Sequence, residues 1–323
     1  GFEVVGIQLG FEGLLTKSFV PLTLDTIRGI LPKGGTLLRT TNRGNPFEYP
    51  ISGGGTEDRS AQCIANIREL GIDGIIAIGG DGTLKIAQRL CDMGIPMVAV
   101  PKTIDNDLAA TDYTFGFHTA VAVATDAVDR LHSTAESHDR VMILEVMGRN
   151  AGWIALYSGI AGGADIILVP EIPYEPEEIV RTISERQSEG AKFDIIVVAE
   201  GAMRRGGEES YLDKASRRLG GIAYQVAAEI QSSIDHEIRV TVLGHIQRGG
   251  SPLAYDRILA SRFGVAAANL VANDAFGQMV ALRGDAIVSV AIKDAVSRPK
   301  CVDPNGDIVQ TALSLGISLG DGR

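Results

Sequence analysis

The chain has 323 residues, of which 30 are basic and 40 acidic, so its formal net charge at pH 7 is −10. Apolar residues make up 45% of it, enough for a buried core, which excludes wholesale disorder. Such an acidic chain lacks the clustered Lys and Arg that a nucleic-acid backbone or an anionic membrane surface requires, so we expect neither as a partner. Its length suggests two domains or one large α/β unit.

The cysteines point to a reducing compartment. Cys63, Cys91 and Cys301 are odd in number and far apart, with neither a CxxC pair nor zinc-site spacing. The longest apolar runs, such as 75–78 and 166–169, fall far short of the ~20 residues of a membrane span, and no leader pattern opens the chain. We expect a cytoplasmic protein.

Short apolar runs alternate with longer amphipathic stretches along the chain. Strands are expected, in chain order, at 3–7, 74–78, 96–100, 141–146, 166–169, 195–199, 240–243 and 286–290. Helices are expected at 60–70, 84–93, 119–131, 151–161, 175–189, 216–233 and 257–272. Continuous apolar strands separated by helices of this length predict a mainly parallel sheet covered on both faces, which is an α/β fold. Residues 1–7 resemble an inner strand, and 206–209 an exposed loop.

Polar and charged residues follow five of the predicted strands. In open α/β sheets the ligand binds beyond the carboxyl ends of the strands. The segments at these ends are 79–83, 101–107, 147–150, 200–201 and 244–250. Core packing does not place charge at such positions, so we expect a functional site on this rim.

The first of these segments, Gly79-Gly80-Asp81-Gly82-Thr83, lies between a strand and a helix expected to start near Leu84. Glycines there let backbone N–H groups approach an anion, and a helix N-terminus favours negative charge. Asp81 would repel a phosphate unless it holds Mg²⁺. The spacing is neither a Walker A loop nor a GxGxxG fingerprint. Alternatively, the segment is a tight turn in which Asp81 caps the helix.

The second segment places Thr103, Asp105 and Asp107 at alternate positions. In an extended chain all three side chains face one side, so they can enter the same cleft. One carboxylate could take a proton from an attacking hydroxyl while the other orients it or contacts a metal. Alternatively, the segment is a turn that bonds its own backbone.

Cationic side chains follow two further strands. Arg149 and Arg248 can bind phosphate through two parallel hydrogen bonds, and His245 can donate to a phosphate or a sugar hydroxyl. Glu200 stands where it can accept hydrogen bonds from sugar hydroxyls.

Arg140 and Arg239 differ because they open strands, and so lie at the opposite end of the same elements. Within one subunit they could not reach the rim. On the residues alone they are surface charges or partners in packing salt bridges.

Five segments together resemble the 6-phosphofructokinase family over essentially the whole chain. They are GGDGT at 79–83, PKTIDND at 101–107, FGFHTA at 115–120, EVMGRNAGW at 145–153 and LGHIQRGGSPLAYDR at 243–257. GGDGT alone is shared with NAD kinases and diacylglycerol-type lipid kinases, but the ordered combination is specific.

The resemblance implies two Rossmann-like, three-layer αβα domains with mainly parallel sheets and an active site in the cleft between them. Residues 1–116 with 252–301 would form the nucleotide domain, and 117–251 with 302–323 the sugar-phosphate domain. The family's amino-terminal strand and first Gly-rich loop have no counterpart here, so we expect the chain to begin at the family's second strand.

The resemblance also implies an activity: transfer of the ATP γ-phosphoryl group to the 1-hydroxyl of fructose 6-phosphate, with Mg²⁺, in glycolysis. Asp105 would be the base, Thr103 would bind the transferred phosphoryl group, and Arg149 would complete the catalytic set. Asp81 would coordinate Mg²⁺, and Asp107 would assist substrate or metal. The nucleotide would contact Gly80, Gly82, Thr83, Lys102 and Arg43. Fructose 6-phosphate would contact Thr103, Asp105, Asp107, Arg140, Met147, Gly148, Arg149, Glu200, Arg239, His245 and Arg248.

Two positions bear on the phosphoryl donor. Gly82 resembles ATP-dependent members, because an Asp there would crowd and repel the nucleotide's α-phosphate. The position of Lys102 holds Gly in many bacterial ATP enzymes and Lys in pyrophosphate enzymes. The combination of Gly82 with Lys102 also occurs in an ATP-dependent branch. We therefore expect ATP, with pyrophosphate as the alternative.

In the family, arginines matching Arg140 and Arg239 reach the 6-phosphate in a neighbouring subunit's site. This implies a homo-oligomer, usually a tetramer, with shared sites, in a family of allosteric enzymes. His132 stands where the bacterial effector site has an arginine, which argues against control by ADP or phosphoenolpyruvate. Two rivals remain: an NAD or lipid kinase, which leaves Arg149 and Arg248 without a purpose, and a non-catalytic or truncated sugar-phosphate-binding subunit.

Overall fold

This computed structural model describes residues 1–207, 210–213 and 218–323, which form two compact units. The first contains Gly1–Lys102, Leu108–Phe115 and Gly249–Arg298, and the second contains Thr103–Asp107, Gly116–Arg248 and Pro299–Arg323. The domain division expected from the sequence stays a prediction. The compact units differ from it most clearly in grouping 103–107 with the second unit.

The first unit is built on one mainly parallel sheet. The strands of the whole unit, including the separate pairs β1–β2 and β3–β4, are β1 (Val5–Ile7), β2 (Phe19–Pro21), β3 (Tyr49–Pro50), β4 (Thr56–Glu57), β5 (Ile75–Gly79), β6 (Met97–Thr103), β7 (Phe115–Gly116), β14 (Gln278–Arg283) and β15 (Ala286–Ala291). Its helices are α1 (Phe11–Thr16), α2 (Leu24–Ile27), α3 (Ser60–Glu69), α4 (Asp81–Asp92), α9 (Ala254–Ala272) and α10 (Ile292–Ala295). Strands β14, β6 and β5 are parallel, and β15 pairs antiparallel with β14 at the edge.

Helices cover both faces of this sheet because its strands are apolar on both sides. On one face Ala77, Met97 and Met279 pack against apolar residues of α1, α3, α4 and α10. On the other, Val98 and Val280 pack against α9 through Phe263. Both layers of buried aliphatic side chains stabilise the unit through the area they remove from water.

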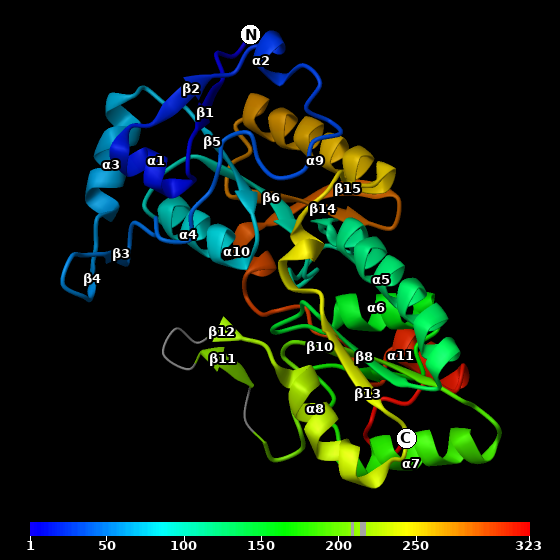
Figure 1. Cartoon of the computed structure of the whole chain (residues 1–323). Helices are drawn as coiled ribbons and strands as arrows, with labels where there is room; N and C mark the ends of the chain where they lie inside the picture. The colour runs from blue at the N-terminus through cyan, green and yellow to red at the C-terminus, as the bar shows by residue number, and fades with distance from the viewer. Residues whose placement is uncertain (208–209, 214–217) are drawn as a thin grey trace. The chain divides into compact units, whose positions relative to one another are not determined.

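The second unit is a parallel sheet with strand order β13-β8-β10-β9. The strands of the unit are β8 (Val141–Val146), β9 (Ile166–Leu168), β10 (Asp194–Ala199), β11 (Tyr211–Asp213), β12 (Arg218–Leu219) and β13 (Ile238–Val242). Its helices are α5 (Phe117–His138), α6 (Trp153–Gly162), α7 (Pro176–Ser188), α8 (Ile222–Ile230), η1 (Gln231–Ser233), η2 (Gly244–Arg248) and α11 (Asp307–Ser314). Helices α7 and α8 share a core with one face of the sheet, and α5 and α6 contact its strands from the other side (Figure 1).

The α/β class, the mainly parallel sheets and the three-layer arrangement of each unit are as predicted. The strand expected at 3–7 differs in its pairing: β1 pairs antiparallel with β2 in a small ribbon and is not an inner strand of the main sheet. The connection through α1 is too short for a parallel crossover. Gln8 N–H also donates to the Ser18 carbonyl at 3.0 Å, which closes the ribbon.

Several helix boundaries also differ; α5, for example, continues to His138 and not to 131. Helix α4 begins at Asp81, so most of 79–83 belongs to the helix's first turn. Helix α8 begins at Ile222 after β12, which corrects the predicted helix start. The prediction over Ser216 and Arg217, and that of a loop over Glu208 and Glu209, lies outside the described residues.

Candidate active site

The carboxyl ends of β8, β10 and β13 meet at one edge of the second unit's sheet. Register brings Ala199 opposite Val146, and Val242 opposite Glu145. The segments that follow, 147–149, 200–201 and η2, are therefore neighbours in space, as the sequence predicted for parallel strands.

Short backbone contacts fix these loops against each other. Gly201 N–H donates to the Gly148 carbonyl at 3.1 Å. A Cβ atom at Gly201 would come within 2.0 Å of the Arg149 carbonyl oxygen, so only glycine permits this approach. The side chain of Gln247 in η2 reaches across and accepts from Met147 N–H at 2.7 Å. The sugar-phosphate candidates from two strand ends are thus held by groups that the sequence analysis did not single out.

Glu200 lies near two other charged side chains of this unit, Asp105 and Arg248. Burial raises the pKa of the Glu200 carboxyl, and the nearby charge of Asp105 raises it further. A backbone hydrogen bond at Gly148 and the charge of Arg248 lower the same pKa. Asp105, Glu200 and Arg248, separated widely in sequence, therefore act on one another electrostatically.

The Thr103–Asp107 loop begins where β6 ends. Asp105 N–H donates to Thr103 Oγ1 at 3.2 Å, and the Thr103 hydroxyl donates to Asp105 Oδ2 at 3.4 Å. Asn106 is buried and adopts a left-handed conformation with φ of 53°. The expected alternation of Thr103, Asp105 and Asp107 on one extended face is therefore wrong, because the chain turns at Asn106. The loop does bond its own backbone, the alternative considered for it, and still places Asp105 beside Glu200.

The remaining candidates on this edge differ in exposure. Met147 is buried, whereas Arg149, His245 and Arg248 are exposed side chains at the ends of β8 and β13. Cationic and imidazole groups are thus accessible to an anionic ligand at the edge where Asp105 and Glu200 lie.

Arg140 and Arg239 lie at the other end of the same strands, as predicted. Arg140 precedes β8, and Arg239 is the second residue of β13. Arg140 Nε donates to Glu237 Oε2 at 2.6 Å, and Arg239 also forms an ion pair with Glu237. Two guanidinium groups thus share one carboxylate at this edge of the unit.

In the first unit, the 79–83 segment forms the start of α4. Gly80 is the residue before the helix and makes no side-chain cap, so Asp81 is the first helical residue and does not cap the helix as the alternative supposed. Asp81 instead pairs with Lys85 one turn on, at 2.8 Å. The N–H groups of Asp81, Gly82 and Thr83 belong to the helix's first turn, where N–H groups lack helical partners and favour anions.

Gly79 and Gly82 serve different purposes. A Cβ atom at Gly79 would meet the Thr83 side chain at 2.4 Å, so Gly79 is required for packing. A Cβ atom at Gly82 would meet nothing within 4 Å, and its φ is not positive. Neither packing nor backbone conformation requires glycine at 82, so the space above it is open.

Lys102 lies beside this turn in the same unit. Register pairs Gly79 with Pro101, so the exposed Lys102, the next-to-last residue of β6, lies beside Gly80, which directly follows β5. Arg43 is exposed in the irregular segment between α2 and β3, and its N–H donates to Thr41 Oγ1 at 3.2 Å. No hydrogen bond or ion pair given for the described residues brings Arg43 to 80–83.

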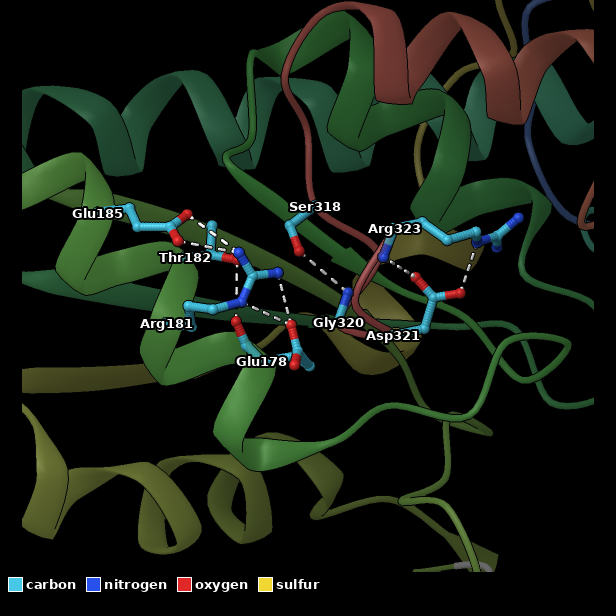
Figure 2. Close-up of polar contacts among 8 residues, drawn as sticks. All are labelled: Glu178, Arg181, Thr182, Glu185, Ser318, Gly320, Asp321 and Arg323. Carbon is cyan, nitrogen blue, oxygen red and sulfur yellow. Dashed lines mark hydrogen bonds and ion pairs between the residues drawn. The ribbon is translucent and has the colours of Figure 1, made fainter.

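A cavity of about 220 Å³ lies elsewhere in the second unit, between α7 and the carboxyl-terminal segment. Its lining includes Arg181 and Arg323. Figure 2 shows the Arg181 guanidinium between Glu178 and Glu185, with the Arg323 side chain bonded to Asp321. The cations of this cavity are already matched by carboxylates, and the cavity contains no residue of the predicted site.

Together, a glycine-rich helix start and a rim of carboxylate, guanidinium and imidazole groups define an α/β protein suited to phosphorylated ligands. A family model described as phosphofructokinase matches residues 1–271. An ATP-dependent 6-phosphofructokinase of Chloroflexus aurantiacus is 52% identical over 322 residues, covering 99% of this chain and 90% of the relative. The chain belongs to the phosphofructokinase family.

Two further matches are a relative named for pyrophosphate and a solved structure. A pyrophosphate–fructose 6-phosphate 1-phosphotransferase of Amycolatopsis mediterranei is 52% identical over 307 residues, covering 94% of this chain and 87% of the relative. A Pichia pastoris phosphofructokinase crystal structure, in the T-state, matches with a TM-score of 0.80 at 30% identity; the match covers 98% of this chain but 35% of that one.

Among the described residues, no helix has the length and apolar character that crossing a bilayer requires.

Proposed function

We propose that this chain is a 6-phosphofructokinase that transfers the γ-phosphoryl group of ATP to the 1-hydroxyl of fructose 6-phosphate. The observation that carries the proposal is the grouping of Asp105 with Glu200 and Arg248 at one edge of the second unit. This reaction requires a carboxylate base, a group that accepts hydrogen bonds from the sugar hydroxyls, and a cation that binds phosphate. Family membership and the names of its relatives support the same substrate.

The reaction assigns a step to each group. Asp105 accepts the proton of the 1-hydroxyl as that oxygen bonds to the γ-phosphorus. The bond from γ-phosphorus to the bridging oxygen breaks, and ADP leaves with the electron pair. Thr103 binds the transferred phosphoryl group, Arg149 completes the catalytic set, and Arg43 stabilises the charge of the transition state. Because the hydroxyl proton leaves late in a loose transition state, an ordinary aspartate suffices as base.

Sugar-phosphate binding falls to the rest of the rim. Glu200 accepts hydrogen bonds from sugar hydroxyls, while His245 and Arg248 contact the phosphorylated sugar, with Met147 and Gly148 lining it. Asp107 assists the substrate.

The donor's phosphates bind at Gly80, Gly82 and Thr83, with Lys102 and Arg43 as cations. The described residues contain no group of three or more His, Cys, Asp or Glu placed to hold a metal ion. Mg²⁺ in nucleotide sites needs only one or two carboxylates beside phosphate oxygens and water, so Asp81 in the first turn of α4 fits it. The ion, when bound, supplies charge that neutralises phosphate oxygens.

Pyrophosphate is the second candidate donor, favoured by Lys102 and by the Amycolatopsis relative. The open space above Gly82 favours ATP, because no atom there would crowd an α-phosphate. We also propose a cytoplasmic homotetramer in which Arg140 and Arg239 complete a neighbour's site, since they lie at the end of their strands away from the rim.

A coupled assay with fructose 6-phosphate, Mg²⁺ and either ATP or pyrophosphate tests the proposal. We expect turnover with ATP at least tenfold more efficient than with pyrophosphate. The reverse ratio assigns the other donor. Sugar-phosphate binding without turnover by either donor indicates a non-catalytic subunit, and turnover of NAD or a lipid in a substrate panel indicates another kinase.

A further inference from the structure

A lysine from the carboxyl-terminal segment holds the loop that carries Asp105. Lys300 Nζ donates to Asn106 Oδ1 at 3.1 Å, across 194 positions of sequence. The backbone N–H of Lys300 also donates to the Asp107 carbonyl at 2.8 Å. Both contacts lie within the second unit. Lys300 thus binds the two residues that follow Asp105, Asn106 through its side chain and Asp107 through its backbone N–H.

The segment around Lys300 is itself anchored. Trp153 Nε1–H donates to the Lys300 carbonyl at 2.7 Å, and the Lys300 ammonium lies 5.6 Å from the centre of the Trp153 ring. Two residues on, Val302 N–H donates to Glu171 Oε1 at 2.7 Å. Glu171 also accepts from Gly152 N–H at 3.0 Å. The backbone from which the Lys300 side chain extends to Asn106 is therefore held by Trp153 and, through Val302, by Glu171.

The loop needs such a support because its conformation is unusual. Asn106 has a φ of 53°, a region that costs most residues about 1 kcal/mol or more and that Asn tolerates better than most. Asn106 is also buried, so its amide oxygen requires a hydrogen-bond donor. Lys300 supplies one, and its charge strengthens the bond.

We propose that Lys300 is a positioning residue for the phosphoryl transfer, setting the Thr103–Asp107 loop through Asn106. It does not touch substrate in this role; it fixes where the base Asp105 and its neighbour Thr103 stand. The inference rests on the proposed function. Because a displacement of about 1 Å at a reacting group can cost 10²-fold in rate, losing this contact should act mainly on kcat.

The test compares Lys300→Met, Lys300→Arg, Asn106→Gly and the double variant Lys300→Met/Asn106→Gly with the wild type. Glycine suits the left-handed φ at 106 and removes the side chain that carries the acceptor. We expect Lys300→Met to lower kcat roughly 10–100-fold while KM for fructose 6-phosphate changes less than about threefold. Lys300→Arg should recover most of kcat, since its guanidinium can still donate to Asn106. The double variant should lose less than the product of the two single losses, because both changes break the bond between Lys300 and Asn106. The exposed Lys293→Met is the matched control and should leave kcat unchanged.

Several outcomes would overturn the inference. They are kcat of Lys300→Met within twofold of wild type, equal impairment of the Arg and Met variants, and losses that multiply in the double variant. Should Lys300→Met not fold, Asn106→Gly decides alone by the same split between kcat and KM. Hydrogen exchange without substrate separates this inference from the proposed function. If the wild type turns over neither donor, faster exchange at 104–107 in Lys300→Met or Asn106→Gly still supports the positioning role, and unchanged exchange overturns it.

Discussion

The carboxylate of Asp105 lies close enough to Glu200 to raise the pKa of the Glu200 carboxyl above what burial alone would give. The two residues come from different strand ends of one unit, and the charge of Arg248 lowers the pKa of the Glu200 carboxyl. Charged groups held in this way destabilise the fold slightly and are common at functional sites. The arrangement therefore costs stability at pH values above the raised pKa of Glu200.

The stability cost predicts a pH-dependent effect of Glu200→Gln. A raised carboxyl pKa means that ionisation is less favourable in the folded state than in the unfolded state. The stability linked to this group is therefore present below the ordinary Glu pKa and is lost as pH rises through the raised value. We expect the variant's Tm to exceed the wild type's at pH 8, and the gap to narrow at pH 5. Thermal unfolding at both pH values measures this. The exposed Glu189→Gln should show no such trend, and a constant gap for Glu200→Gln would contradict the assignment.

Removing the proposed base, Asp105, should slow the reaction without weakening substrate binding. Asp105→Asn keeps the shape of the side chain but cannot accept the hydroxyl proton. We expect kcat to fall roughly 10²–10⁴-fold, with KM for fructose 6-phosphate within about threefold of wild type. Steady-state kinetics in the coupled assay provides both constants. The exposed Asp73→Asn serves as control. If Asp105→Asn keeps its rate, another group is the base.

Arg239 offers a test of shared sites. If it completes a neighbour's site, Arg239→Ser should raise KM for fructose 6-phosphate tenfold or more. Arg239→Ser and Asp105→Asn subunits, unfolded together and reassembled in equal amounts, should then form about one quarter intact sites, because each site draws one residue from each of two subunits. With fructose 6-phosphate held well below the KM of the Arg239→Ser variant, activity of the mixture well above the mean of the two separate variants is the expected result. Activity equal to that mean would place Arg239 outside any shared site.

The sequence predicted best the elements whose residues carry a uniform local signal. Strand β8 was predicted with its observed bounds because each of its residues is buried, so the apolar run is nearly continuous. Strand β14 was missed although Gly284 and Asp285, which join it to β15, are a two-residue hairpin turn signal in the sequence. Residues such as Lys300 and Gln247 act through partners more than 90 positions away, and no local pattern reveals such contacts.

Donor choice should respond to Gly82. Because a Cβ atom there would meet nothing within 4 Å, Gly82→Asp should fold normally, with a Tm within about 2 °C of wild type. Its carboxylate would occupy and charge the space left for the α-phosphate. We expect kcat/KM for ATP to fall roughly 10²-fold while pyrophosphate turnover falls much less. Gly79→Ala is the contrasting variant: its methyl group would collide with Thr83, so it should lower the Tm instead. Equal loss with both donors in Gly82→Asp would separate Gly82 from donor selection.

Gln247 should couple stability to sugar-phosphate binding. Its buried amide oxygen is the acceptor for Met147 N–H, so Gln247→Ala removes that partner and opens a cavity beside the loop. Leaving a buried donor without its acceptor costs about 1–3 kcal/mol, which denaturant unfolding can measure. Because Met147 and Gly148 line the proposed sugar site, KM for fructose 6-phosphate should rise several-fold while kcat changes less. The exposed Gln310→Ala provides the matched control and should shift neither quantity. A stability loss without any change in KM would confine Gln247 to a packing role and leave the loop's position independent of it.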